Sequence, residues 1–160
     1  MAEAVVNSSP LIYLSASDHL ELLRLAGAPV AVPEAVSREV HKWGEDDPAA
    51  QALRTTAWLT SVPDPAPAAS VLAWDLGAGE SAVIAWALAH PGTSAVIDDL
   101  AARRCAAAHG IAVRGTLGLV LTARRREAIP SARRVIEELR DAGMYLSDAV
   151  ADRALALVDE

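Results

Sequence analysis

The chain has 160 residues, of which 52% are apolar, and this is enough to bury an ordinary core without disulfides. Its formal net charge of −7 and sequence pI near 5.0 argue against a generic nucleic-acid-binding protein. Charges or prolines interrupt every apolar run well before the roughly 18 residues of a membrane span. We therefore expect a single domain over residues 1–160.

Two features favour a cytoplasmic location. The first residues, MAEAVVNSS, have neither the basic region nor the apolar stretch of a signal peptide. Cys105 is the only cysteine, so no internal disulfide can form, as is usual in a reducing compartment.

Short apolar strands alternate with helices in the N-terminal half. Residues 4–6 predict a buried strand that stops at Asn7, and the SSP sequence that follows predicts a helix start, because proline suits the first turn. The elements expected next are two short helices on either side of residues 17–19, a strand over 30–32, helices over 33–44 and 47–58, and a short strand over 60–62.

The same alternation continues in the C-terminal half, after a proline-rich surface loop over 63–70. The expected elements are a helix over 80–89, a strand over 95–97, a helix over 99–109, a strand over 111–113, and helices over 116–125, 131–142 and 147–157.

This alternation predicts βαβ units, and hence an α/β fold of three layers, α/β/α, with a central parallel sheet flanked by helices. Ligands of such sheets bind beyond the carboxyl ends of the strands. Asn7, the Asp98–Asp99 pair and Thr116 each follow a predicted strand. We expect them to meet at one edge of the sheet, within reach of Glu39 and Glu80 on helices.

The Asp98–Asp99 pair is the strongest local signal, because adjacent carboxylates repel each other and favour a nearby cation or arginine. The alternative is structural: Asp98 would cap the following helix and Asp99 would favour its dipole. Glu80 opens a helix after the glycines of GAGE, and first-turn dipole stabilisation is likewise its alternative role.

Glu39 and Asn7 also have alternative roles that involve no metal or substrate. A solvated surface glutamate is the default for Glu39, whose helix carries valines at 36 and 40. Asn7 would normally cap a helix or sit in a turn. Gathered from distant segments, however, these oxygen-bearing groups are the ligands that Mg²⁺ or Mn²⁺ prefers, and such ions serve to cleave phosphodiesters.

Positive charge is concentrated between residues 100 and 140, which hold nine arginines and three acids. This segment carries a net charge of +6, so the remainder carries −13. An acidic centre beside a basic flank suits an enzyme that binds metal in one place and phosphate in another. The arginines expected to contact flanking phosphates are 103, 104, 114 and 124–126, although solvated helix faces would also account for them.

Other chemistries have no support. The four histidines show no paired metal spacing, and neither a dinucleotide-binding fingerprint nor a phosphate-binding loop occurs. The tryptophans at 43, 58, 74 and 86 fall at helical positions and are expected to pack against the protein rather than to stack on bases. Cys105 lies on the apolar side of a helix and is expected to be inert.

The segments VVNSSPLI, PEAVSREV, GAGESAVIAWAL, AVIDDLAARR and GTLGLVLTARR together resemble the PIN-domain family, the fold of VapC-type toxins and other small ribonucleases. The resemblance covers nearly the whole chain. It places the family's acidic positions at Asn7, Glu39, Glu80 and Asp99, with Asp98 adjacent, and a more variable polar position at Thr116. Asn7 departs from the pattern, because most active members carry aspartate there.

The resemblance implies an Mg²⁺- or Mn²⁺-dependent endoribonuclease that uses a metal-activated water, with Glu80 and Asp99 as leading ligands and Asp98, Glu39 and Asn7 in support. It also implies a homodimer and, for toxin members, a cognate antitoxin. Two alternatives remain: a PIN-fold module that binds RNA or protein without cutting, with Asn7 as the sign of a decayed site, and an α/β hydrolase or phosphatase with an aspartate nucleophile.

Overall fold

A five-stranded parallel sheet forms the centre of the computed structural model, which describes residues 4–160. Its strands, in chain order, are β1 (Ala4–Val6), β2 (Val30–Pro33), β3 (Leu59–Val62), β4 (Ser94–Val96) and β5 (Val113–Arg114). Their order across the sheet is β3-β2-β1-β4-β5, and every neighbouring pair is parallel.

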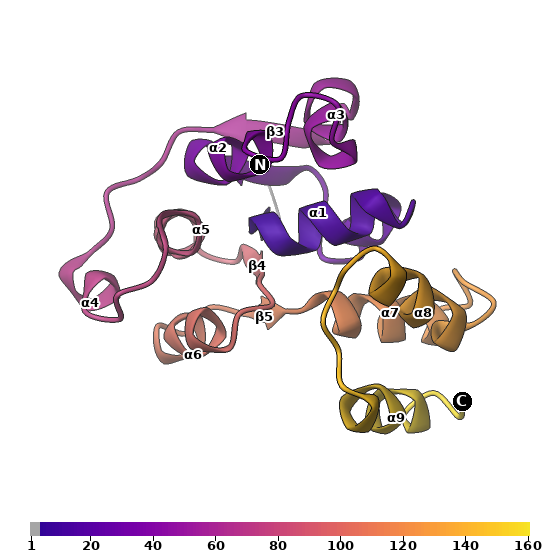
Figure 1. The fold of residues 1–160 in the computed structure, drawn as a ribbon. Helices are drawn as coiled ribbons and strands as arrows, with labels where there is room; N and C mark the ends of the chain where they lie inside the picture. Colours follow the sequence, from indigo (N-terminus) through magenta and orange to yellow (C-terminus); the bar gives the residue numbers. More distant parts are fainter. Residues whose placement is uncertain (1–3) are drawn as a thin grey trace.

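Helices cover both faces of this sheet. They are α1 (Ser8–Ala16), the 3₁₀ helix η1 (Leu20–Leu25), α2 (Glu34–His41), α3 (Pro48–Thr55), α4 (Ala69–Leu72), α5 (Ala78–Ala89), α6 (Leu100–Ala108), α7 (Thr116–Arg125), α8 (Ala132–Asp141) and α9 (Asp148–Ala156). Figure 1 shows α5 and α6 on one side of the sheet and α1, α7 and α8 on the other. The predicted three-layer α/β/α class is confirmed.

The central strands are short runs of alanine and valine with no exposed residue. All three residues of β1 are fully buried, and so are Ala95 and Val96 of β4. A strand buried on both faces needs apolar side chains at every position rather than at alternate ones. This requirement explains why the apolar runs of the sequence were recognisable as strands.

The order in which strands are added to the sheet changes direction between β1 and β4. From β1 it moves outward to β2 and β3, and it then crosses back to β4 and continues to β5. Val6 lies opposite Val96, and the backbone N–H of Asn7 continues the ladder by donating to Val96 O at 3.0 Å. Such a switch point, at the carboxyl ends of the strands, is where parallel sheets bind ligands.

Several element boundaries differ from the predicted ones. The helix predicted over 47–58 ends at Thr55, because Trp58 already accepts a bond from Val30 N and belongs to the approach to β3. The strand predicted over 111–113 begins only at Val113, because Ile111 N donates to Ala106 O in the turn that closes α6.

The loop predicted over 63–70 runs into a short helix, α4, that the sequence did not indicate. The fully buried side chain of Val71 anchors it to the core. The prediction that all four tryptophans occupy helical positions is also wrong. Only Trp86 lies in a helix, whereas Trp43 and Trp74 lie in exposed turns and Trp58 in the turn before β3.

Within the part of the chain that the structure describes, all helices are too short or too polar to cross a membrane.

Candidate active site

Asn7 is a buried polar residue at the carboxyl end of β1, with 2% of its surface exposed. It occupies the N-cap position of α1, yet its side chain makes no capping hydrogen bond. Its amide oxygen, Oδ1, is buried without any hydrogen-bond partner among residues 4–160. Buried polar atoms are nearly always satisfied, so this oxygen is suited to a ligand that the described chain does not supply.

Asp98 follows β4, the strand beside β1, and Thr116 holds its carboxylate in place. The Thr116 backbone N–H donates to Asp98 Oδ1 and the Thr116 hydroxyl donates to Asp98 Oδ2, both at 2.7 Å. Thr116 is completely buried, so its hydroxyl is aimed at Asp98 rather than at solvent. The two residues are 18 positions apart and meet because β4 and β5 are neighbours.

Asp99 has a different environment from Asp98. It is the N-cap of α6, and its Oδ2 accepts a bond from Ala102 N at 2.9 Å. The structural alternative made Asp98 the helix cap, and this is wrong. Asp99 caps the helix, whereas Asp98 bonds to Thr116. Of the two carboxylates, Asp98 is the one that Thr116 holds at both oxygens.

Glu39 links two helices that meet at the same edge of the sheet. Ser8 Oγ donates to Glu39 Oε2 at 2.7 Å, and the backbone N–H of Gly79 donates to Glu39 Oε1 at 3.0 Å. Ser8 directly follows Asn7, and Gly79 directly precedes Glu80. Glu39 thus ties the start of α1 to the first turn of α5 rather than lying on a solvated face.

Glu80 is partly buried in the first turn of α5. Its side chain folds back over the start of the helix, so a β-carbon placed on Gly77 would lie 2.5 Å from Glu80 Oε2. Within the described residues the Glu80 carboxylate has no hydrogen-bond or ion-pair partner. Among the five predicted site residues, Asn7, Glu80 and Asp99 therefore each have a side-chain oxygen without a partner in the described chain, and on Asp99 this oxygen is Oδ1.

The family model described as PIN domain matches residues 3–160. The chain belongs to the PIN domain family. No curated protein and no solved structure matches this PIN domain in the corresponding searches.

The predicted site residues carry the oxygen ligands that a divalent cation prefers, but their carboxylates are not gathered into a ready-made metal site. Residues 4–160 contain no group of three or more His, Cys, Asp or Glu side chains arranged to hold a metal ion. Glu39, Asp98 and Asp99 instead accept hydrogen bonds from other parts of the protein. A carboxylate has about four lone-pair sites, so these bonds leave acceptor capacity on Asp98. Together with the unsatisfied Asn7 oxygen, this oxygen-only donor set suits Mg²⁺ or Mn²⁺.

A hollow of about 800 Å³ beside Asp98 carries part of the predicted basic flank of this PIN domain. Arg103, Arg114 and Arg125 line it, whereas Arg104 is exposed on α6 outside its lining. Arg103 is fixed by the bond from its Nη1 to Ile97 O at 2.9 Å. A β-carbon on Gly115 would lie 2.5 Å from Arg103 Nη1 and 3.3 Å from Asp98 Oδ1, so guanidinium and carboxylate converge over this glycine.

Other arginines of the basic segment are committed to the fold. Arg124 pairs with Glu160, Arg134 with Glu138, and Arg140 with Asp148. Their charges are partly neutralised within the protein, which leaves the arginines around the 800 Å³ hollow as the better candidates for contacts with phosphate.

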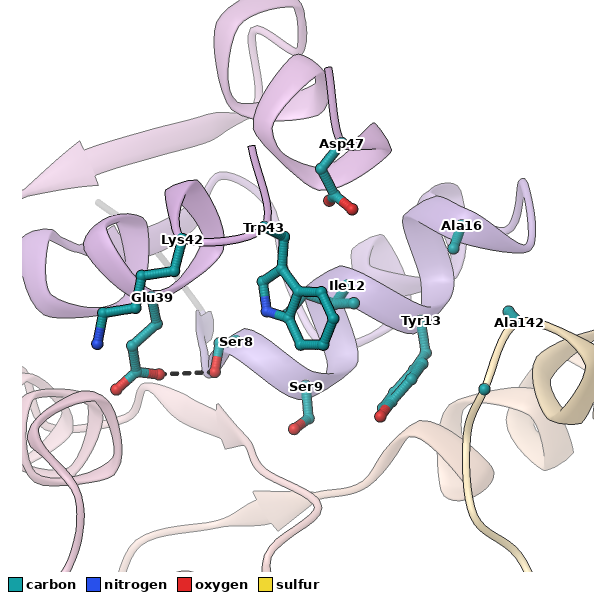
Figure 2. A pocket seen from close by; sticks show the side chains of 11 residues that line it. Ser8, Ser9, Ile12, Tyr13, Ala16, Glu39, Lys42, Trp43, Asp47 and Ala142 are labelled. Carbon is teal, nitrogen blue, oxygen red and sulfur yellow. Dashed lines mark hydrogen bonds between the residues drawn. The ribbon is translucent and has the colours of Figure 1, made fainter. Parts of the chain in front are cut away.

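Sequence reasoning did not find two features of the site. The hydroxyl of Ser8 holds Glu39, and the SSP sequence was taken only as a helix start. A second hollow of about 690 Å³ lies next to Glu39 and is lined by Ser8, Tyr13 and Trp43 (Figure 2). No spacing rule relates these residues, because they come from α1 and from the turn after α2.

Cys105 is fully buried, and burial raises the pKa of its thiol, in keeping with an inert residue.

Proposed function

We propose that this protein is an Mg²⁺- or Mn²⁺-dependent endoribonuclease, with residues 1–160 forming a single PIN domain. The observation that carries the proposal is the unsatisfied buried oxygen of Asn7, on the strand next to the one that Asp98 follows. Membership of the PIN domain family supports it, because this fold is generally that of nucleases.

Each residue has a role in this proposal that follows from its contacts. Asn7, Glu80 and Asp98 would hold the cation, since Asn7 and Glu80 have oxygens without partners in the described chain and Thr116 fixes the direction of the Asp98 carboxylate. Thr116 positions Asp98, Glu39 positions the first turn of α5, and Asp99 caps α6. When bound, the cation lowers the pKa of a water molecule and screens the charge of the scissile phosphate.

The arginines would hold the substrate backbone on either side of the scissile bond. Arg103 and Arg114 present guanidinium groups next to Asp98, where they can contact flanking phosphates. Arg104 would contribute only at longer range, from the exposed surface of α6.

The second candidate function is a binding module that does not cut, and Asn7 is the observation that favours it. An amide in place of an acid removes one negative charge from the site and weakens its attraction for a divalent cation. Titration with Mn²⁺ separates the nuclease from the binding module, because a nuclease must bind Mn²⁺ at the concentrations at which it cleaves RNA.

The test is cleavage of a structured RNA in Mn²⁺ or Mg²⁺ by the wild type and by three variants. We expect Glu80→Gln and Asp98→Asn to lose cleavage and Mn²⁺ binding. Asp99→Asn is the matched control, because asparagine caps a helix about as well as aspartate. Asp99→Asn should retain most of its RNA cleavage and most of its Mn²⁺ binding.

Two results would contradict the proposal. Wild-type protein without metal-dependent cleavage and without Mn²⁺ binding would favour the binding module. Loss of cleavage in Asp99→Asn with retention in Asp98→Asn would reverse the assignment of the two aspartates.

Family membership also supports two proposals about partners. We infer a homodimer, which light scattering on the purified protein tests directly. If the protein is the toxin of a toxin–antitoxin pair, a cognate antitoxin should cover the acidic site, and co-expression of the neighbouring reading frame should suppress RNA cleavage.

A further inference from the structure

The 690 Å³ hollow lies directly beside the proposed catalytic centre. Glu39 and Ser8, which join α1, α2 and α5 at that centre, also form part of its lining. Its volume is within the range of pockets that bind small organic groups, roughly 300–1,000 Å³. The hollow is therefore a place for a part of the substrate next to the scissile bond.

Two aromatic rings from different elements face this hollow. Tyr13 comes from α1 and Trp43 from the turn after α2, and Figure 2 shows both rings among the side chains that line the pocket. Trp43 is 70% exposed and makes no ring contact within residues 4–160. A large indole kept in solvent beside a site, without packing on the core, is available to stack on a flat partner.

The charges of the hollow indicate what that partner is. Glu39 and Asp47 contribute carboxylates, and Lys42 is the one cation among the lining residues of the described range 4–160. These carboxylates would repel a phosphate, whereas Arg103, Arg114 and Arg125, in the otherwise largely apolar hollow beside Asp98, would attract one. The occupant should be a neutral planar group with hydrogen-bond donors, and the hydroxyls of Ser9 and Tyr13 add further polar contacts.

A nucleobase has these properties, since its ring is planar and uncharged and it carries exocyclic amino or ring N–H donors. The base can reach such a hollow only when it is unpaired and unstacked from its neighbours. Stacking on an aromatic side chain tolerates every base, because each has a π-face.

We propose that the Trp43–Tyr13 hollow binds one unpaired nucleobase of the RNA, stacked on Trp43, while the Arg103–Arg114–Arg125 hollow holds the backbone on the other side of the acidic centre. Trp43 is then a specificity-determining residue that selects single-stranded RNA. This inference rests on the proposed ribonuclease function, but base binding does not itself require the metal.

The experiment measures affinity in EDTA, without cleavage, for a labelled single-stranded oligoribonucleotide, for the same strand with abasic residues, and for the corresponding duplex. We expect the wild type to prefer the intact single strand over both. A stacked base contributes a factor of about 5 to about 150 in affinity, so the preference over the abasic strand should be on the order of tenfold.

Trp43→Ala should abolish the preference for the intact over the abasic strand, and Trp43→Phe should restore part of it. Trp74→Ala is the matched control, because Trp74 is also an exposed tryptophan in a turn but does not line the hollow. It should keep the full preference. Circular dichroism of each variant verifies that the fold is retained.

The outcomes separate this inference from the proposed function. If Trp43→Ala keeps the preference for the intact strand, or if the duplex binds as tightly as the single strand, the base site is refuted, whatever the cleavage assay shows. The hollow would then suit a side chain of a protein partner. If the preference depends on Trp43 but Mn²⁺ produces no cleavage, the base site stands and the nuclease proposal fails.

Discussion

At the residue scale, Thr116 determines how Asp98 is presented. Its backbone and hydroxyl donate to different oxygens of the same carboxylate, and Thr116 itself is fully buried while both bonds are partly buried. A carboxylate held at both oxygens loses its freedom to rotate, so its remaining lone pairs point in a fixed direction. Residues that orient a metal ligand in this way commonly affect metal affinity by about 10- to 100-fold.

Thr116→Val keeps the shape of the side chain but removes the hydroxyl donor. We expect Mn²⁺ affinity and RNA cleavage to fall about tenfold, because Asp98 keeps only its bond from the backbone N–H. Stability should fall by about 1–3 kcal/mol, the cost of a lost buried hydrogen bond. Isothermal titration with Mn²⁺ and urea unfolding measure the two effects.

Thr55→Val is the control for this change, because Thr55 is exposed at the end of α3 and its hydroxyl donates to Gln51 O of the same helix. It should alter neither metal affinity nor cleavage. Equal metal affinity in wild type and Thr116→Val would show that Thr116 does not position a ligand.

At the element scale, the close approach of α5 to Glu39 requires glycine at position 79. A β-carbon there would lie 2.7 Å from both carboxylate oxygens of Glu39, far inside normal contact. Glu39 cannot simply move aside, because Ser8 also holds it. Gly79 thus lets the first turn of α5, and with it Glu80, lie against α2.

Gly79→Ala should therefore displace Glu39 and impair cleavage, although alanine is the better helix former. Gly118→Ala is the matched variant for stability alone, because Gly118 also lies inside a helix and a β-carbon there meets nothing within 4 Å, but Gly118 lines the 800 Å³ hollow. It should stabilise the protein by up to about 1 kcal/mol. Thermal unfolding and cleavage rates distinguish the two, and a Gly79→Ala protein with normal activity would contradict the proposed role of Glu39.

The start of α8 is held by Glu160. Its carboxylate accepts bonds from the backbone N–H groups of Arg133 and Ala132, both at 2.9 Å, and from Arg124 Nε at 2.8 Å. The two backbone bonds and the Arg124 guanidinium lower the pKa of Glu160 to about 2. This contact ties the end of the chain described here to α7 and α8.

This contact predicts a loss of stability in acid. Because the pKa of Glu160 is lower in the folded protein than its ordinary 4.5, its contribution is complete above about pH 5 and disappears as the pH falls towards 2. Glu160→Gln should be less stable than wild type at neutral pH, and the difference should shrink between about pH 5 and 2. Urea unfolding across this range measures it, and a pH-independent difference would exclude the titration of Glu160 as its cause.

At the scale of the whole molecule, charge is separated although the total is −7. The arginine-lined hollow lies beside the acidic centre, so an RNA strand would be attracted by one side of the site and repelled by most of the remaining surface. Binding should therefore depend on a few local contacts with phosphate.

Arg114→Gln should weaken the binding of single-stranded RNA to a similar extent for all sequences. Each phosphate contact contributes about 0.7 to the slope of log affinity against log salt for single strands, so the slope should decrease by about that amount. Arg54→Gln is the control, since Arg54 pairs with Glu45 on the surface away from this hollow. A salt slope unchanged by Arg114→Gln would remove the basic hollow from the substrate path.

Much of the fold could be predicted because its signals are local. The alanine–valine strands, the helix starts at Ser131 and Ser147 and the parallel α/β class follow from short-range patterns, and the structure has all of them. Boundaries shifted where a long-range bond intervened, as at Trp58, which pairs with Val30 before β3 begins.

The sequence by itself determined the fold class, the family and the oxygen-bearing residues that could meet at the carboxyl edge of the sheet. Only the tertiary structure decided what those residues do. It gave the cap of α6 to Asp99 and the contact with Thr116 to Asp98, left the Asn7 oxygen unsatisfied, and placed exposed Trp43 in the same hollow as Glu39. The physical reason is that helix and strand periodicity depends on neighbours a few residues apart, whereas hydrogen-bond partners and pocket walls depend on which distant segments the sheet brings together.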